Sequence, residues 1–141
     1  MTVQEKSEVI ERDERPIDAI SLTTAQRRFL ERLMESTRKY ARSKHYNDLT
    51  FLGHGNESYY CAYSTKTKRR FFVFGFERRR GVLYMGIPIE IDEPYRLARV
   101  WIGDPKRKRV IIKIEEDPTE EMQLYFIEMG RRSIDYYYRR R

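Results

Sequence analysis

The chain has 141 residues and a mass of 17.2 kDa, which is the size of one ordinary domain. A hydrophobic share of 40%, with seven glycines and five prolines, is typical of a globular protein and excludes a collagen-like or low-complexity chain. The single cysteine, Cys61, excludes an internal disulfide framework and any metal site built from several thiolates.

The apolar runs of the sequence are short. None is long enough to span a bilayer, and the first residues lack the apolar stretch of a signal peptide. We therefore expect a cytoplasmic protein with no membrane partner.

Charge is the most unusual property of the chain. Twenty-nine basic residues against 22 acidic ones give a net charge of +7 and a pI near 9.6, and arginine outnumbers lysine 21 to 8. Many charged residues with few amides suit a heat-adapted protein. The planar guanidinium also binds phosphate oxygens as a bidentate fork. Because heat adaptation explains the charge density but not the positive surplus, we predict a polyanionic partner.

Residues 1–20 show no sustained hydrophobic period, and Pro16 interrupts them. This composition predicts a mobile arm or an added edge strand. Residues 21–141 are predicted to form a single α+β domain with a basic tail.

A helix is predicted from Thr23 to about Ser43. Thr23 followed by Gln26 is typical of a capping box. Apolar side chains then recur at three- and four-residue spacings, and basic side chains occupy the other face. Solvated charges explain that basic face more readily than a binding role does. The core positions predicted from this period are Phe29, Leu30, Leu33, Thr37, Tyr40 and Ala41.

Between Asp48 and Glu115 the helical period disappears and short β-rich runs alternate with turn residues. The connections are too short for parallel crossovers, which favours an antiparallel meander. The predicted strands are 49–52, 58–63, 70–76, 81–87, 97–102 and 109–114.

A second helix is predicted at the end of the chain. Asp117 precedes Pro118, which we expect at the first helical position, and an apolar face runs from Met122 to Tyr136 or Tyr137. Gly130 weakens the middle of this helix by about 1 kcal/mol relative to alanine. The predicted fold is therefore α+β, with both helices on one face of an antiparallel sheet of five or six strands.

The positive surplus is local. Residues 64–80 hold seven bases and one acid, and residues 96–109 hold six bases and one acid. In a meander, successive turns alternate between the two ends of a sheet. We therefore expect Lys106–Arg109 to join Arg78–Arg80 at one end, with Lys66–Arg70 at the other. A phosphate backbone would neutralise such a cluster, although acidic neighbours or simple solvation of the loop tips explain it nearly as well.

Eleven tyrosines form the second unusual feature, and several lie close to basic residues. Such rings stack on unpaired nucleotides in single-strand binders, but tyrosine is also a common strand former. We predict that Tyr59 and Tyr63 pack in the sheet, whereas Tyr138 and the arginines after it are freer to contact a backbone.

Catalytic chemistry is weakly signalled. His45 and His54 are the only imidazoles, and a ribonuclease would need both in one cleft with a nearby cation. Cys61 is expected to be a buried small hydrophobic residue. No phosphate-binding glycine loop occurs. We therefore predict no metal site and no cofactor.

The sequence also carries a family resemblance. Its residues are 63–74 (YSTKTKRRFFVF), 117–121 (DPTEE) and 133–137 (SIDYY), within a match over about residues 48–138. In these segments the chain resembles small α+β domains of the MmcQ/YjbR-like group and the uncharacterised "predicted transport protein" family. The resemblance implies a standalone or accessory domain.

The leading hypothesis is a non-enzymatic domain that binds the backbone of DNA or RNA. The alternatives are a small ribonuclease or toxin-like enzyme using His45 or His54, and a protein-interaction module that forms a homodimer or meets an acidic protein. The predicted nucleic-acid-binding residues are Lys66, Lys68, Arg69, Arg70, Arg78, Arg79, Arg80, Lys106, Arg107, Lys108, Arg109, Arg139, Arg140 and Arg141.

Overall fold

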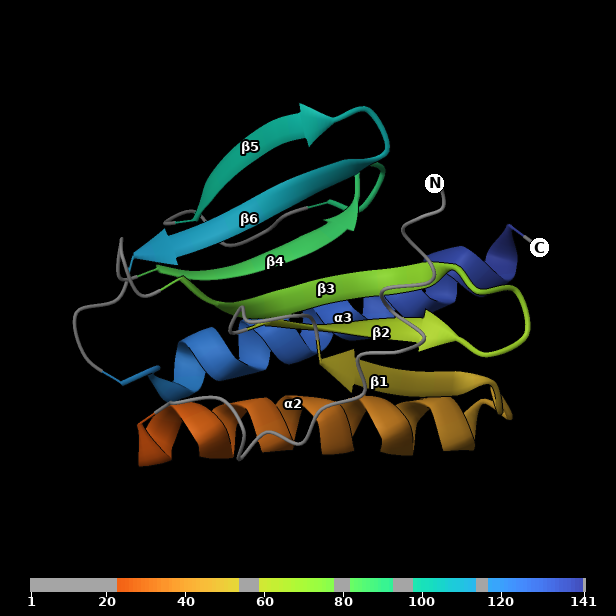
Figure 1. The fold of residues 1–141 in the computed structure, drawn as a ribbon, viewed down its shortest axis with the longest axis horizontal. Helices are drawn as coiled ribbons and strands as arrows, with labels where there is room; N and C mark the ends of the chain where they lie inside the picture. The colour runs from red at the N-terminus through yellow and green to blue at the C-terminus, as the bar shows by residue number, and fades with distance from the viewer. Residues whose placement is uncertain (1–22, 54–58, 78–81, 93–97, 114–116, 141) are drawn as a thin grey trace.

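The computed structural model describes residues 23–53, 59–77, 82–92, 98–113 and 117–140. These parts of the chain form two helices and one antiparallel six-stranded sheet, and Figure 1 shows both helices on the same side of it. The predicted α+β fold is confirmed. Neither described helix is long and apolar enough to cross a membrane. The elements are α2 (Thr24–Ser43), β1 (Leu49–Gly53), β2 (Tyr59–Ser64), β3 (Arg70–Glu77), β4 (Val82–Pro88), β5 (Arg99–Asp104), β6 (Arg107–Lys113) and α3 (Glu120–Arg139).

Helix α2 begins as the sequence predicts. The Gln26 backbone N–H donates to Thr23 Oγ1 at 3.0 Å, and the Thr23 N–H donates to Gln26 Oε1 at 3.1 Å. This capping box satisfies backbone donors that have no partner inside the first turn.

The carboxyl end of α2 uses His45 in the left-handed region, with φ of 63°. The His45 N–H donates to Arg42 O at 3.1 Å and the Tyr46 N–H to Ala41 O at 2.8 Å, which are the two bonds of a Schellman motif. His45 therefore occupies the position at which helices usually place glycine.

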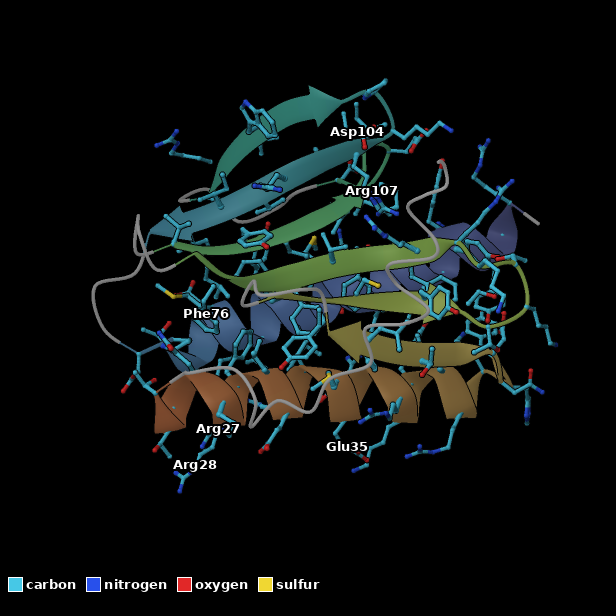
Figure 2. The ribbon with its side chains drawn as sticks, in the orientation of Figure 1. Arg27, Arg28, Glu35, Phe76, Asp104 and Arg107 are labelled. Atoms are coloured by element: carbon cyan, nitrogen blue, oxygen red, sulfur yellow. The ribbon has the colours of Figure 1, made fainter. Side chains whose placement is uncertain are left out.

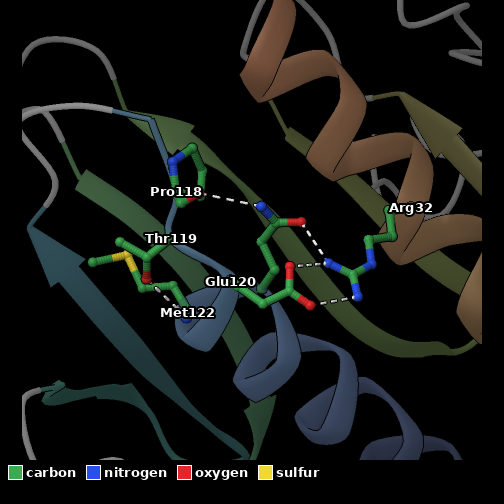
Figure 3. A network of polar contacts seen from close by, with 6 residues as sticks. Arg32, Pro118, Thr119, Glu120 and Met122 are labelled. Carbon is green, nitrogen blue, oxygen red and sulfur yellow. Dashed lines mark hydrogen bonds and ion pairs between the residues drawn. The ribbon is translucent and has the colours of Figure 1, made fainter.

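Helix α3 begins later than predicted. The N-cap is Thr119, whose hydroxyl accepts from the Met122 N–H at 3.2 Å, so Pro118 lies before the helix rather than at its first position. The start of α3 is held to α2 by Arg32, whose two Nη atoms donate to the Glu120 carboxylate at 2.8 and 2.9 Å (Figure 3). Thr119 caps the helix because its hydroxyl accepts from a backbone N–H of the first turn, which has no carbonyl partner inside the helix.

The core lies between the sheet and the two helices. Strand alternation directs Phe72, Phe74 and Phe76 of β3 toward the helices, where Phe29 of α2 meets the Phe76 ring edge to face with centroids 6.3 Å apart. At Gly130 of α3 a Cβ atom would sit 3.1 Å from the Phe72 ring, so glycine permits this close approach. The core positions predicted on α2 are buried except for Tyr40, which is half-buried.

A β-bulge interrupts the start of β3. Tyr63 pairs with Arg70 and Ala62 with Phe72, so Phe71 is the extra residue. As a result, Phe71 and Phe72 both join the core beneath the sheet.

The strand order differs from a meander. It is β1-β2-β3-β4-β6-β5, so β5 pairs with β6 and not with β4. Arg107 pairs with Pro88, the last residue of β4, and Lys113 pairs with Val82, the first. The β5–β6 turn therefore lies at the end of the sheet where β4 ends.

Candidate nucleic-acid interface

Three basic segments meet at one end of the sheet. Figure 1 shows the β2–β3 turn, the β5–β6 turn and the last turn of α3 at this end. The expectation that Lys106–Arg109 would lie at the end where Glu77 pairs with Val82 is wrong, because Arg107 pairs at the opposite end of β4. The turn that precedes Arg70 joins this cluster instead.

A pocket of about 730 Å³ opens between these segments, and we call it the basic pocket. Five bases against two acids line it, which leaves a formal charge of +3. The charged lining residues are Arg69, Arg70, Lys106, Arg107, Arg140, Glu90 and Asp104. The remaining lining residues are Thr67, Phe71, Pro88, Pro105, Tyr136 and Tyr137.

Hydrogen bonds of the Ser64 side chain hold the β2–β3 turn in place and so fix the position of Arg69 and Arg70. The Ser64 hydroxyl donates to the buried Asp48 carboxylate at 2.5 Å and accepts from the Thr67 N–H at 3.1 Å. The Tyr138 hydroxyl donates to the other Asp48 oxygen. The turn is therefore tied to the end of α3, and the prediction of a freer Tyr138 is wrong, because its ring is half-buried and its hydroxyl is bonded.

Arg107 is the most enclosed cation of the basic pocket. Its Nη2 donates to Arg70 O at 3.0 Å, close to Pro88, which has no backbone N–H of its own to donate. Burial and the neighbouring charge of Arg70 lower the pKa of Arg107, while Asp104 raises it. Arginine keeps its proton in proteins, so the enclosed Arg107 guanidinium stays charged although little water can solvate it. An anion that enters the pocket would therefore be bound strongly.

The β5–β6 turn presents the other side of the pocket. Asp104 Oδ1 accepts from the Lys106 N–H at 2.8 Å and so closes the turn. Figure 2 shows Asp104 and Arg107 near one another at this end of the sheet. One of the two pocket carboxylates is therefore partly engaged by the backbone.

The end of α3 contributes two tyrosines, and the C-cap residue Arg140 follows them. The Arg140 guanidinium lies 5.4 Å from the centroid of the Tyr136 ring. The hydrogen bond from Tyr136 lowers the pKa of Glu90, and the charge of Arg140 lowers it further. Glu90 is thus ionised at neutral pH and is the pocket's second internal anion.

The internal anions do not cancel the cations. Across the described ranges of the chain, no ion pair joins Arg69, Lys106, Arg107 or Arg140 to a carboxylate. Among the described residues, Asp104 and Glu90 therefore act on Arg107 and Arg140 without forming ion pairs, and the net positive lining favours an anionic ligand.

The remaining predicted residues divide into three groups. Lys66, Lys68 and Arg139 are exposed at the same end but do not line the pocket, and Lys66 Nζ donates to Asn47 Oδ1 at 3.4 Å. Lys108 and Arg109 line a second hollow. Arg78, Arg79, Arg80 and Arg141 lie outside the described residues, as do His54 and the arm over residues 1–20.

The second hollow, here called the aromatic hollow, has a volume of about 380 Å³. Sequence reasoning missed its two aromatic members, Tyr84 and Trp101. The period of two along β6 offered a signal, because it places Arg107 and Arg109 on one face and Trp101 pairs with Arg109. The lining residues are Arg70, Val73, Tyr84, Gly86, Trp101, Gly103, Asp104, Arg107, Lys108 and Arg109.

The residues considered for catalysis lie elsewhere or are buried. His45 is exposed at the end of α2 and lines neither the basic pocket nor the aromatic hollow. Cys61 is fully buried, as predicted, and burial raises the pKa of its thiol to about 11 despite the nearby charges of Arg70 and Arg107. Such a thiol is a poor nucleophile at neutral pH. No group of three or more metal-ligating side chains occurs within the described segments.

Comparisons with known proteins return nothing that resembles this chain: no family model, no curated protein and no solved structure matches it. The resemblance to MmcQ/YjbR-like domains therefore stays a prediction.

Proposed function

We propose that the protein binds nucleic acid by holding backbone phosphates in the basic pocket. The observation that carries this proposal is the convergence of Arg69, Arg70, Lys106, Arg107 and Arg140 from three segments on one pocket with two carboxylates. Guanidinium groups bind phosphate oxygens through two parallel hydrogen bonds. A phosphate in the pocket would also relieve the poor solvation of Arg107.

The charge around the pocket favours a polymer over a single small anion. Lys66, Lys68 and Arg139 extend the positive surface beyond the pocket at the same end of the sheet. The net charge of +7 adds a long-range attraction for a polyanion. Phosphates placed along a backbone would meet both the pocket and this surrounding surface.

The test compares two doubly neutralised variants. Replacing Arg69 and Arg140 with glutamine removes two pocket cations, and replacing Arg28 and Lys39 with glutamine removes two exposed cations of α2. Figure 2 shows Arg28 pointing away from the sheet. Binding of DNA and RNA is measured across a range of salt concentrations.

We expect the pocket variant to weaken binding to every sequence. The slope of log affinity against log salt should become shallower by roughly 0.7 to 0.9 for each phosphate that the variant no longer neutralises. The α2 variant should leave the slope unchanged. Absence of binding to any nucleic acid at low salt would refute the proposal, as would equal effects of the two variants.

The exposed strand β5 supports protein interaction as a second candidate function. It forms one edge of the sheet, and Val100, Trp101 and Ile102 are 47%, 57% and 57% exposed. Apolar edge strands commonly pair with another chain. Sedimentation tests this function, because a dimer formed through β5 should dissociate when Val100 is replaced with lysine.

A further inference from the structure

Trp101 presents a flat aromatic surface on the sheet. All six residues of β5 are exposed, and 57% of the Trp101 surface is accessible. Its ring lies across Gly103, where a Cβ atom would come within 2.0 Å of the indole. Part of the ring therefore packs on glycine backbone, while more than half of the Trp101 surface stays accessible.

Arg109 and Tyr84 continue this surface across the sheet. The Arg109 guanidinium lies 5.7 Å from the Trp101 ring centroid and 4.6 Å from the Tyr84 ring centroid. Arg109 pairs with Gly86 on β4, where Val73 occupies the space that a side chain would need, since an added Cβ would lie 2.8 Å from Val73 Cγ2. The hollow is therefore bounded by aromatic rings and cations above two glycines.

The aromatic hollow and the basic pocket adjoin. Arg70, Asp104 and Arg107 line both of them. A ligand with a planar ring in the hollow would have its phosphates beside the arginines shared with the pocket. A nucleotide within a strand has this combination of a flat base and a charged backbone.

We propose that the aromatic hollow stacks an unpaired base against Trp101, so that the protein prefers single-stranded nucleic acid to a duplex. This inference rests on the proposed function and adds to it a preference for single strands over duplexes. In a duplex the faces of the bases are occupied by their neighbours, whereas an unpaired base has a face free to stack on an aromatic side chain.

A protein strand added to β5 explains fewer of these features. Edge pairing uses the backbone of β5 and the apolar side chains beside it. It does not require a guanidinium beside the Trp101 and Tyr84 rings, as Arg109 provides here. The lining of the hollow therefore favours a base over a second protein chain.

Trp101 also supplies the assay, because it is the only tryptophan in the chain. The full-length protein is titrated with oligothymidylate, with oligouridylate and with a duplex of equal length, while tryptophan fluorescence and affinity are followed together. We expect both single strands to quench the fluorescence and to bind more tightly than the duplex.

Four variants locate the effect. Trp101→Ala should weaken single-strand binding by about 5- to 150-fold, the range for loss of one stacked base, and leave duplex binding unchanged. Trp101→Phe should retain most of the affinity. Gly103→Ala should also weaken single-strand binding, because the new methyl group displaces the indole without a change of charge. Ile102→Ala is the matched control, since Ile102 is equally exposed on the same strand but does not line the hollow.

The outcomes separate this inference from the proposed function. Equal binding of single strand and duplex without quenching would overturn the stacking role and leave phosphate binding intact. Absence of binding to every oligonucleotide would overturn both. Loss of a dimer in Trp101→Ala, with nucleic-acid affinity unchanged, would overturn the stacking role in favour of protein interaction. The circular dichroism spectrum and melting temperature of each variant verify the fold, and Gly103→Ala carries the test if Trp101→Ala does not fold.

Discussion

Replacing His45 with glycine should stabilise the protein. His45 has a φ of 63°, a conformation that costs a residue with a side chain about 1–2 kcal/mol and costs glycine almost nothing. The side chain is exposed, and the two hydrogen bonds that end α2 come from the backbone, so glycine keeps them. Glycine also gives the unfolded chain more freedom, which subtracts about 0.5–1 kcal/mol. We expect a net gain of about 0.5–1 kcal/mol and a melting temperature higher by about 2–4 °C.

The measurement is urea and thermal unfolding of the wild type, His45→Gly and His45→Ala. Alanine removes the imidazole but keeps a Cβ, so it should give no gain and a small loss. Equal stabilisation by both variants, or destabilisation by glycine, would show that the left-handed conformation is not the source of the effect. The same proteins test the ribonuclease alternative, because RNA cleavage by the wild type that disappears in the more stable glycine variant would make His45 catalytic.

Three further predictions concern the packing that supports the basic end. In an exposed helix, replacing glycine with alanine raises the free energy of unfolding by about 1 kcal/mol. Gly130→Ala should show no such gain in denaturant unfolding, because its Cβ would lie 3.1 Å from the Phe72 ring. A full gain would contradict this packing. Tyr138→Phe removes a donor to the buried Asp48 carboxylate and should lower the free energy of unfolding by about 1–3 kcal/mol in the same experiment, whereas no change would mean that Asp48 does not depend on this bond. Burial, aided by the hydrogen bond to Asp135, raises the pKa of Tyr40 to about 12, so its contribution to stability is present below about pH 10 and lost as the pH rises through about 12. Unfolding measured across this range should therefore show a steeper loss in the wild type than in Tyr40→Phe, and parallel curves would contradict the shift.

The elements of the fold were predictable because their signals are local. The capping box at Thr23 and Gln26 satisfies donors within one turn of helix, so neighbouring residues suffice to fix where α2 begins. The runs rich in aromatic and β-branched residues became the six strands, with ends that moved by a residue or two. At α3 the predicted start at Pro118 was wrong, because the N-cap is Thr119.

The candidate site was only partly predictable. Local composition identified the basic segments, and five of the predicted residues do line one pocket. Composition did not identify Tyr136 and Tyr137 as lining residues, because they belong to a helix that meets the sheet end only in the folded chain. Trp101 was missed for a similar reason: its role depends on Arg109 of the neighbouring strand and on the glycine beneath its ring.

The sequence by itself determined the helices, the strands and the amount of charge in each turn, since these depend on residues a few positions apart. Only the tertiary structure decided which turns meet. Whether β4 pairs with β5 or with β6 is not fixed locally, because the β5–β6 hairpin can present either of its strands to β4. By placing β6 between β4 and β5, the fold moved Lys106 and Arg107 to the opposite end of the sheet, beside Arg69, Arg70 and Arg140.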